Sequence, residues 1–274
     1  MTKQSNIDFM IQKSYSWVQD TIIDFIGRRM EIDRLSQLGY ALLRTNELLS
    51  GQYSPKQEII DELFAQIVQE QKRDGGWKDV EETMWALAAL KYSKKDQESL
   101  NNGYGWLKKQ RAYSGGWGRS KRDFARIPVT CRIAILHGNI CNKSDFDLIL
   151  SELDNEVLDP KNTFFLTYKV ALPLMAFKKN NLTISNKNQL CKLLSKEQND
   201  DGGYAPWKNH PITSEIHSSA YALMAFLQDS RYDKEAAGII RWMYESQLSD
   251  GSWPSHFIDC GTSIGLLALI ETRG

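Results

Sequence analysis

The side chains best suited to chemistry lie in three short segments of the sequence. Asp79, Glu81 and Glu82 place three carboxyl groups within four residues. A carboxyl group that its surroundings keep protonated can act as a general acid. Glu215 and His217 lie two residues apart and form the second segment, and a later cysteine, Cys260, forms the third. Whether these groups can work together depends on how the chain positions the segments.

A repeat of turns and helices indicates how the chain positions these three segments. In four places a helix ends in Gln, and a Gly-containing turn leads to an aromatic residue: residues 71–77, 110–117, 198–204 and 247–253. A Gly-Gly step supplies the positive φ that ends a helix tightly. We expect the Gln side chain to hydrogen-bond to exposed backbone amides of the turn.

Two further copies of the repeat are less regular. One is expected between the second and third turns, with residues 162–177 as its second helix, and residues 31–49 match the second-helix pattern at the front of the chain. The spacing of the copies is typical of solenoids and closed helical arrays.

The two helices of each repeat differ in composition. First helices such as residues 59–71 carry one apolar stripe and one charged face, which is typical of an outer layer. Second helices carry small residues at close spacing, such as Ala86, Ala88 and Ala89, and small residues let neighbouring helices of an inner ring approach closely. The sequence therefore predicts an all-α fold, a single α/α barrel (toroid) of about six helical hairpins that spans residues 1–274.

Superposing the second helices on Ala86, Ala222 and Gly265 aligns two positions at one mouth of this barrel. The first position holds Arg34, Asp79, Ile127, Leu166, Glu215 and Ile258, and the second holds Ser36, Glu81, Val129, Tyr168, His217 and Cys260. Titratable groups concentrate on the second, fifth and sixth hairpins, and the sixth adjoins the first in a closed ring. The alignment predicts one concave site with acidic groups, an imidazole and a thiol.

The Gln-to-aromatic turns resemble the repeats of the squalene cyclase and protein prenyltransferase superfamily, from roughly residue 56 to the end of the chain. This resemblance implies a barrel with an apolar central cavity that takes isoprenoid chains. Complement thioester domains and some carbohydrate enzymes share the barrel but not the turn motif. The chain also contains no segment like the Cys-Gly-Glu-Gln of a thioester site.

Residues 78–90 look like the Asp-x-Asp-Asp-Thr segment of class II terpene cyclases, whose middle aspartate protonates an alkene or epoxide. The resemblance makes Glu81 the proton donor and Asp79 and Glu82 its supports. Two of the family's aspartates are glutamates here, and class II cyclases usually build their cavity between two barrels. The alternative is that these acidic residues only favour the first turn of a helix through its dipole.

A zinc site is the second hypothesis. In the resembling prenyltransferase β subunit, Asp and Cys two residues apart bind zinc together with a His from another inner helix. Glu215 and His217 match the pair with other competent ligands, and Cys260 lies two residues after the position of the family's His, which here is Ile258. Three protein ligands would leave a position for a substrate thiol. The alternative is that His217 is a polar core residue and Cys260 an inert buried thiol.

Four further residues are candidates for substrate contacts. Trp85 and Tyr168 could stabilise a carbocation with their aromatic faces, and Arg34 and Arg126 could hold a diphosphate at the mouth. The resemblance therefore favours an isoprenoid-handling enzyme that performs class II-type cyclisation without a cofactor. Zinc-dependent prenyl transfer, and a non-catalytic barrel that binds an apolar ligand or a peptide, are the alternatives.

Composition limits the partners. Lys and Arg number 34 and so do Asp and Glu, so nothing suggests a nucleic-acid footprint. The sequence has no secretory signal, no apolar run of about 18 residues and no Cys-x-x-Cys pair. We therefore expect a cytoplasmic protein with reduced cysteines that handles an apolar small molecule. A partner subunit and a peripheral contact with a membrane remain open.

Overall fold

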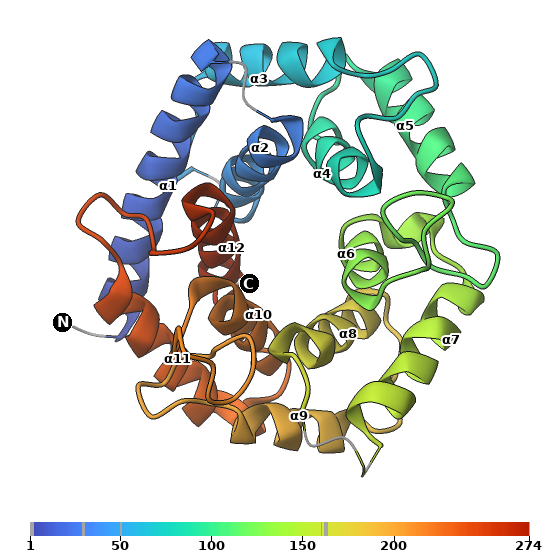
Figure 1. Ribbon diagram of the computed structural model, residues 1–274. Helices are drawn as coiled ribbons and strands as arrows, with labels where there is room; N and C mark the ends of the chain where they lie inside the picture. Colours follow the sequence, from blue (N-terminus) through green and yellow to red (C-terminus); the bar gives the residue numbers. More distant parts are fainter. Residues whose placement is uncertain (1–2, 29–30, 50, 160, 162–163, 274) are drawn as a thin grey trace.

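The computed structural model describes residues 3–28, 31–49, 51–159, 161 and 164–273. All regular elements of this part of the chain are helical, and they form two concentric rings (Figure 1). The inner ring contains α2 (Ile32–Leu48), α4 (Val80–Leu90), α6 (Ile127–His137), α8 (Thr167–Lys179), α10 (Ile216–Phe226) and α12 (Ile258–Glu271). The outer ring contains α1 (Lys3–Arg28), α3 (Gln57–Gln69), α5 (Gln97–Lys109), α7 (Lys143–Glu152), α9 (Lys187–Lys196) and α11 (Asp233–Ser246). The predicted all-α barrel of six hairpins is confirmed.

The degenerate hairpins also lie where the sequence predicted them. α2 covers residues 31–49 closely, and α8 occupies most of residues 162–177, of which 162 and 163 lie outside the described residues, as do 1, 2 and 274 of the predicted domain range. Three short helices connect larger ones: η1 (Gly138–Ile140), η2 (Leu153–Val157) and η3 (Ser230–Tyr232). Within the described part of the chain, no helix has the length and apolarity needed to cross a bilayer.

Burial explains the division into two rings. Every residue of α4 except Glu81 is buried, which is typical of a helix surrounded on all sides. The outer helix α3 buries only one stripe, formed by Ile59, Ile60, Leu63, Phe64 and Ile67. Outer helices therefore cover the inner ring with one apolar face, as their composition predicted.

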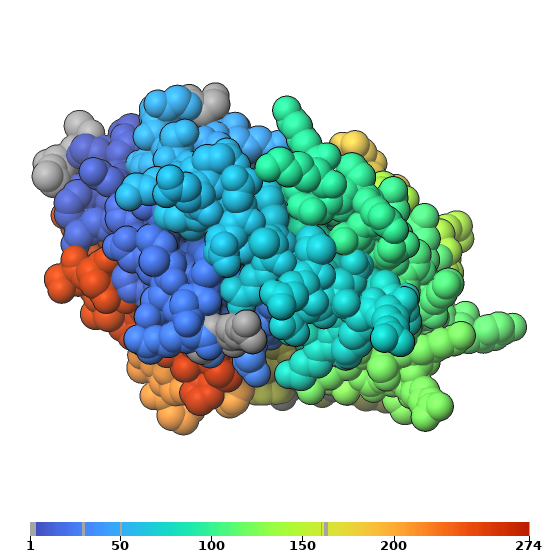
Figure 2. Space-filling view, turned by 90° about the horizontal axis from the view of Figure 1, so that it is seen from above, coloured from blue at the N-terminus to red at the C-terminus, as the bar shows by residue number. Residues whose placement is uncertain are grey.

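The ring closes where the last hairpin meets the first. α12 packs against both α1 and α2, so the blue and red ends of the chain adjoin on one side of the molecule (Figures 1 and 2). The junction of α4 and α6 is the least closely packed of the six inner junctions. Side chains at that junction are therefore exposed to the centre of the barrel.

The Gln residues of the repeat have a different role from the one predicted. Gln71 donates through Nε2 to the carbonyl of Gly75 at 2.7 Å and to that of Ser99 in α5 at 2.8 Å. Gln247 does the same with Gly251 and with Met10 of α1, at 3.0 and 3.2 Å. Both side chains bond to carbonyl oxygens, and each ties its turn to the neighbouring outer helix. Gln110 differs, because its Oε1 accepts from the backbone N–H of Lys121 at 3.0 Å.

The aromatic residue of each turn fixes the inner helix. Trp77 donates its indole N–H to the carbonyl of Ile67 at 2.8 Å, and its backbone N–H donates to the Thr83 hydroxyl at 3.0 Å. The same two bonds recur at Trp117, Tyr204 and Trp253. Thr83 therefore has a structural role at the start of α4.

Candidate active site

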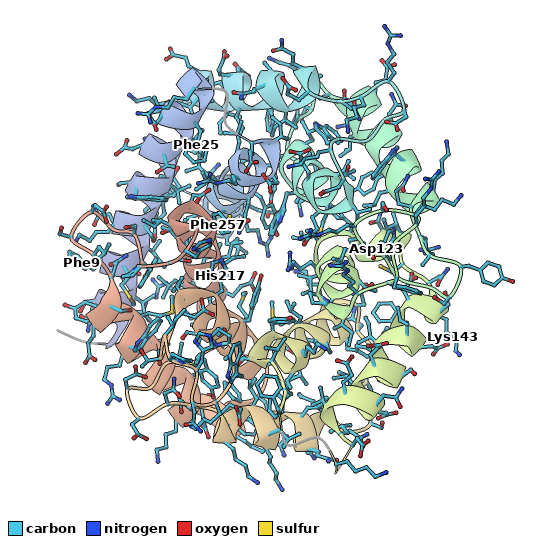
Figure 3. All side chains as sticks on the ribbon, viewed as in Figure 1. Phe9, Phe25, Asp123, Lys143, His217 and Phe257 are labelled. Carbon is cyan, nitrogen blue, oxygen red and sulfur yellow. The ribbon has the colours of Figure 1, made fainter. Side chains whose placement is uncertain are left out.

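All six inner helices begin at the same mouth of the barrel, where they surround a cavity of about 590 Å³. The side chains that line it are spaced four apart on each helix, because such residues share one helical face. An upper layer contains Asp33, Glu81, Tyr168, His217 and Cys260, and a lower layer contains Gln37, Trp85, Arg132, Leu172 and Tyr221. Figure 3 places His217 and Phe257 beside the central opening, with Phe9 and Lys143 on the outside of the barrel.

The alignment made from sequence is correct for four of the six upper positions and wrong for two. Glu81, Tyr168, His217 and Cys260 line the cavity, whereas Ser36 and Val129 are buried and do not. On α2 the lining residue is Asp33, which sequence reasoning missed. Asp33 is the second residue of its helix, as Glu81, Tyr168 and His217 are of theirs. Counting from the helix start, not from the small residues, would have found it.

Asp79 and Glu82 hold the start of α4 and are not free for other work. Asp79 is the N-cap residue, and its Oδ1 accepts from the backbone N–H of Glu82 at 2.9 Å. Glu82 accepts from the backbone N–H of Lys78, the residue before the N-cap, at 2.6 Å. The two carboxyl groups therefore satisfy two backbone N–H groups at the start of α4. Burial raises the pKa of Glu82, although the hydrogen bond from Lys78 opposes the shift.

Glu81 is the one carboxyl group of this segment that reaches the cavity without a backbone partner in the described structure. Its Oε1 lies 3.0 Å from Nη1 of Arg132 on α6, and its Oε2 lies 3.4 Å from Nε of Arg119. It thereby bridges the open junction of α4 and α6. Both oxygens of Glu81 are therefore paired with guanidinium groups.

Asp33 lies in a different environment on the neighbouring helix α2. Its Oδ1 accepts from the backbone N–H of Arg34 at 2.8 Å, and no ion pair forms with it among the described residues. Burial is the main cause that raises the pKa of Asp33, and the carboxylates of Glu31 and Asp79 add to it. Burial therefore favours the protonated form of Asp33, as it does that of Glu82 at the same mouth.

The candidate zinc ligands do not come together as a metal site. In the part of the chain that the structure describes, no three His, Cys, Asp or Glu side chains form a group that could hold a metal ion. Glu215 caps α10, accepting from the backbone N–H groups of His217 and Ser218 at 3.0 and 2.6 Å. Burial acts to raise the pKa of Glu215, but the bonds from His217 and Ser218 outweigh it and keep the pKa low. This carboxylate is thus occupied by its own helix.

Cys260 is a protonated thiol in this cavity. Burial raises its pKa to about 12, and the nearby carboxylate of Asp259 adds to the shift. A metal would have to displace that proton, because only the thiolate is a ligand. His217 contacts Glu215 at 3.3 Å and the hydroxyl of Ser255 at 3.4 Å. The arrangement does not fit zinc.

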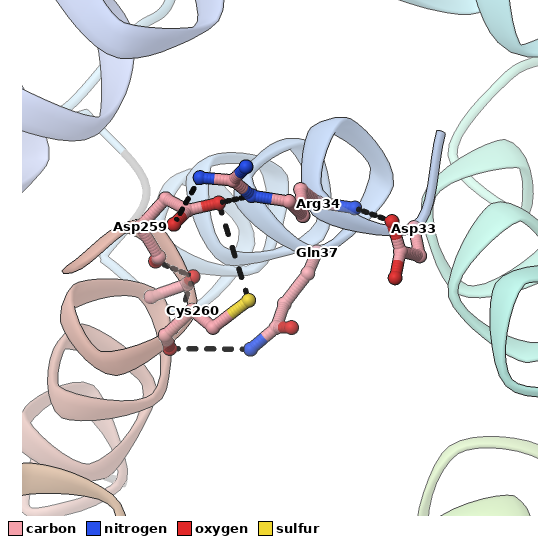
Figure 4. A network of polar contacts seen from close by, with 6 residues as sticks. Asp33, Arg34, Gln37, Asp259 and Cys260 are labelled. Carbon is pink, nitrogen blue, oxygen red and sulfur yellow. Dashed lines mark hydrogen bonds and ion pairs between the residues drawn. The ribbon is translucent and has the colours of Figure 1, made fainter. Parts of the chain in front are cut away.

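The four predicted substrate contacts separate into two groups. Trp85 and Tyr168 line the cavity. Arg34 does not: its guanidinium binds both carboxylate oxygens of Asp259 on α12, and Asp33 points away from this pair (Figure 4). Arg126 pairs with Asp123 at 2.9 Å and lines an adjoining groove of about 490 Å³. Lys78, Arg119 and Arg132 are the Lys and Arg residues that line the cavity in their place.

Solved structures of other proteins share this fold. The type II terpene cyclase MstE from Scytonema is 15% identical, with a TM-score of 0.66, and the match covers 95% of this chain and 98% of MstE. A protein from Actinoplanes is 14% identical with a TM-score of 0.62, over 95% of this chain and 100% of that one. A possible member of the GH105 family from Klebsiella pneumoniae is 13% identical with a TM-score of 0.64, over 100% and 94%. Identities this low establish the fold alone.

Sequence comparison gives a family. No curated protein matches the chain, but the family described as the A-macroglobulin TED domain matches residues 133–271. The expected likeness to terpene cyclases is therefore supported at the level of the helical barrel, and the matching family is another user of that barrel. Because the match spans slightly more than half of the sequence, the chain belongs to the A-macroglobulin TED domain family.

Proposed function

We propose that this protein is an isoprenoid-handling enzyme that starts a class II-type cyclisation by protonating its substrate in the 590 Å³ cavity. One observation carries the proposal. Two carboxyl groups at equivalent helical positions, Asp33 and Glu81, line the same cavity in opposite surroundings. Pairs of titratable groups whose environments drive them toward different protonation states are typical of acid–base sites.

Asp33 is the proton donor in this proposal. Its protonated carboxyl group gives the proton to a terminal alkene or epoxide and becomes a carboxylate, and the substrate becomes a carbocation. Loss of a proton from the cyclised cation then returns the carboxyl group to its starting state. Burial of Asp33 keeps the proton available before the reaction.

Glu81, the donor predicted from the sequence, has a different part. It pairs with Arg119 and Arg132 and holds two guanidinium groups at the cavity. Such a cluster can hold the anionic head of a substrate. The isoprenoid chain would then lie against Trp85, Leu172 and Tyr221, and the aromatic faces would stabilise the cation.

The neighbour MstE supports this substrate class. One of its structures contains geranylgeranyl dihydroxybenzoate as the substrate, and this chain aligns with 98% of that protein. A type II cyclase can therefore match a chain of this size almost end to end, which is compatible with cyclisation in a single barrel. The same molecule is the natural first substrate to test.

The experiment compares two carboxyl-to-amide variants. Purified protein is incubated with geranylgeranyl dihydroxybenzoate, geranylgeranyl diphosphate and squalene, and products are measured by mass spectrometry. Asp33→Asn should lower turnover by about 10²- to 10⁴-fold, whereas Glu81→Gln should chiefly raise KM. Asp147→Asn, on the exposed face of α7, is the matched control. Turnover that survives Asp33→Asn and is lost in Glu81→Gln would restore the assignment made from the sequence.

A non-catalytic binder is the second candidate. It is favoured by the fact that the whole acidic segment has structural partners: Asp79 and Glu82 cap α4, and Glu81 bridges α4 and α6. In that case none of the three substrates is converted, and an apolar molecule co-purifies with the protein. Native mass spectrometry of the purified protein separates this candidate from the enzyme.

A further inference from the structure

A second cavity opens at the opposite mouth, where the inner helices end. Its volume is about 480 Å³, which is within the usual range of small-molecule sites, about 300 to 1,000 Å³. Its wall is mainly apolar and includes Leu136, Met175, Met224, Ile264 and Leu267. Methionine side chains adapt to ligands of irregular shape. Nothing in the proposed reaction uses this cavity.

Four residues separate the two cavities. Trp85, Arg132, Leu172 and Tyr221 line both of them and form a partition across the barrel. Arg132 donates from Nη1 to Glu81 on the side of the first cavity, but its Nε is buried and has no hydrogen-bond partner among the described residues. A buried donor without a partner is costly, so the partition contains a group that a ligand could satisfy.

The rim of the second cavity is basic. Lys178 and Lys179 lie in the last turn of α8, both are exposed, and neither forms an ion pair within the described part of the chain. Glu271 is the one carboxylate among the described residues that line the cavity, and it lies 3.5 Å from Arg44. Lysines are common in the last turn of a helix because of its dipole. That preference does not account for an apolar cavity beside them.

We propose that this mouth is a second binding site for a single-chain anionic amphiphile. The head, a carboxylate or a phosphate, binds Lys178 and Lys179 at the rim, and the chain fills the apolar cavity as far as the partition. Apolar contact supplies most of the affinity, and the two ammonium groups select an anion over a cation. The site shares the partition with the first cavity but does not require the reaction proposed there.

The test is isothermal titration with three probes of equal chain length below their critical micelle concentrations: dodecanoate, dodecyl phosphate and dodecyltrimethylammonium. One equivalent of either anion should bind, and the cation should not. The double variant Lys178→Glu, Lys179→Glu should weaken anion binding by about tenfold or more, whereas Lys192→Glu on the outer helix α9 should leave it unchanged.

Two substitutions show which cavity holds the alkyl chain of the probe. Met224→Trp fills the second cavity and should abolish binding, and Cys260→Trp fills only the first cavity and should leave it intact. Circular dichroism confirms that each variant is folded. The proposal is overturned if neither anion binds at one equivalent, if the cation binds equally well, or if Cys260→Trp and not Met224→Trp removes binding. Unchanged affinity in the lysine double variant, which alters only surface residues, would also overturn it.

Discussion

The ion pair of Arg34 and Asp259 should be a main contributor to closing the barrel. It joins α2 of the first hairpin to α12 of the last, and Nη2 of Arg34 lies 2.8 Å from Oδ1 of Asp259 (Figure 4). The Asp259 side chain is 3% exposed and that of Arg34 is 24% exposed. The rings of Phe25 and Phe257 lie 5.2 and 5.9 Å from the guanidinium carbon. Asp259→Ala would leave this cation largely buried without its partner.

The expected cost follows from that burial. Removing one partner of a fully buried pair destabilises a protein by about 3 to 5 kcal/mol. Arg34 keeps some contact with water, so we expect about 2 to 3 kcal/mol for Asp259→Ala. In a chain of this size that corresponds to a fall of about 4 to 5 °C in Tm. The double variant Arg34→Met, Asp259→Leu should recover most of the loss, because it replaces both charges with apolar groups of similar size.

The assay is urea unfolding of the wild type, Asp259→Ala and the double variant, followed by tryptophan fluorescence. Lys143→Met, which breaks an exposed pair with Asp147, is the control and should not change the midpoint. A loss below about 1 kcal/mol for Asp259→Ala would refute the reasoning. It would show that helix packing alone closes the ring.

Three further predictions concern stability and surface contact. Burial lowers the pKa of His137 to about 4. As the pH falls, the unfolded chain therefore binds a proton at His137 before the folded protein does. The stability that neutral His137 contributes is complete above about pH 6.5, and about 3 kcal/mol of it is lost by pH 4. Urea unfolding across this range should show that loss in the wild type and not in His137→Gln. Gly75 has a φ of 94°, and an added Cβ would lie 2.7 Å from the carbonyl oxygen of Asn102. Gly75→Ala should therefore lower the free energy of unfolding by about 1 to 3 kcal/mol. Gly105→Ala is the control and should not lower it, because its Cβ would meet open space. Co-sedimentation with anionic vesicles tests for a peripheral membrane contact. Phe124 is 91% exposed, so Phe124→Ser should reduce binding of the protein to the vesicles. Equal sedimentation of the wild type and Phe124→Ser would exclude a membrane contact through Phe124.

The barrel was predictable because its signals are local. Each Gln-to-aromatic turn combines a helix end, a glycine at positive φ and an aromatic residue, and all three act over a few residues. The copies add to one another, so six weak patterns fix one architecture. The exact partners of Gln71 were not predictable, because one of them, the carbonyl of Ser99, belongs to the next hairpin.

The candidate site was harder to predict because it depends on the start of each helix. A shift of three residues on α2 exchanges buried Ser36 for Asp33, which lines the cavity. α2 follows no Gly-containing turn, so its sequence offers no marker of where it begins. The ion pairs of Glu81 with Arg119 and Arg132 were also invisible, since they join segments that no pattern relates.

These ion pairs explain why a cyclase-like acidic segment can keep its position in the fold and yet have a different role. A cyclase-like segment needs two things from its acidic residues, a firm helix start and a proton. Here Asp79 and Glu82 supply the first by accepting from the backbone N–H groups of Glu82 and Lys78 at the start of α4. Both oxygens of Glu81 are paired with arginines, so the reaction that we propose takes its proton from elsewhere on the ring. Asp33, at the same helical position one hairpin away and raised in pKa by burial, is the group that we propose as its source.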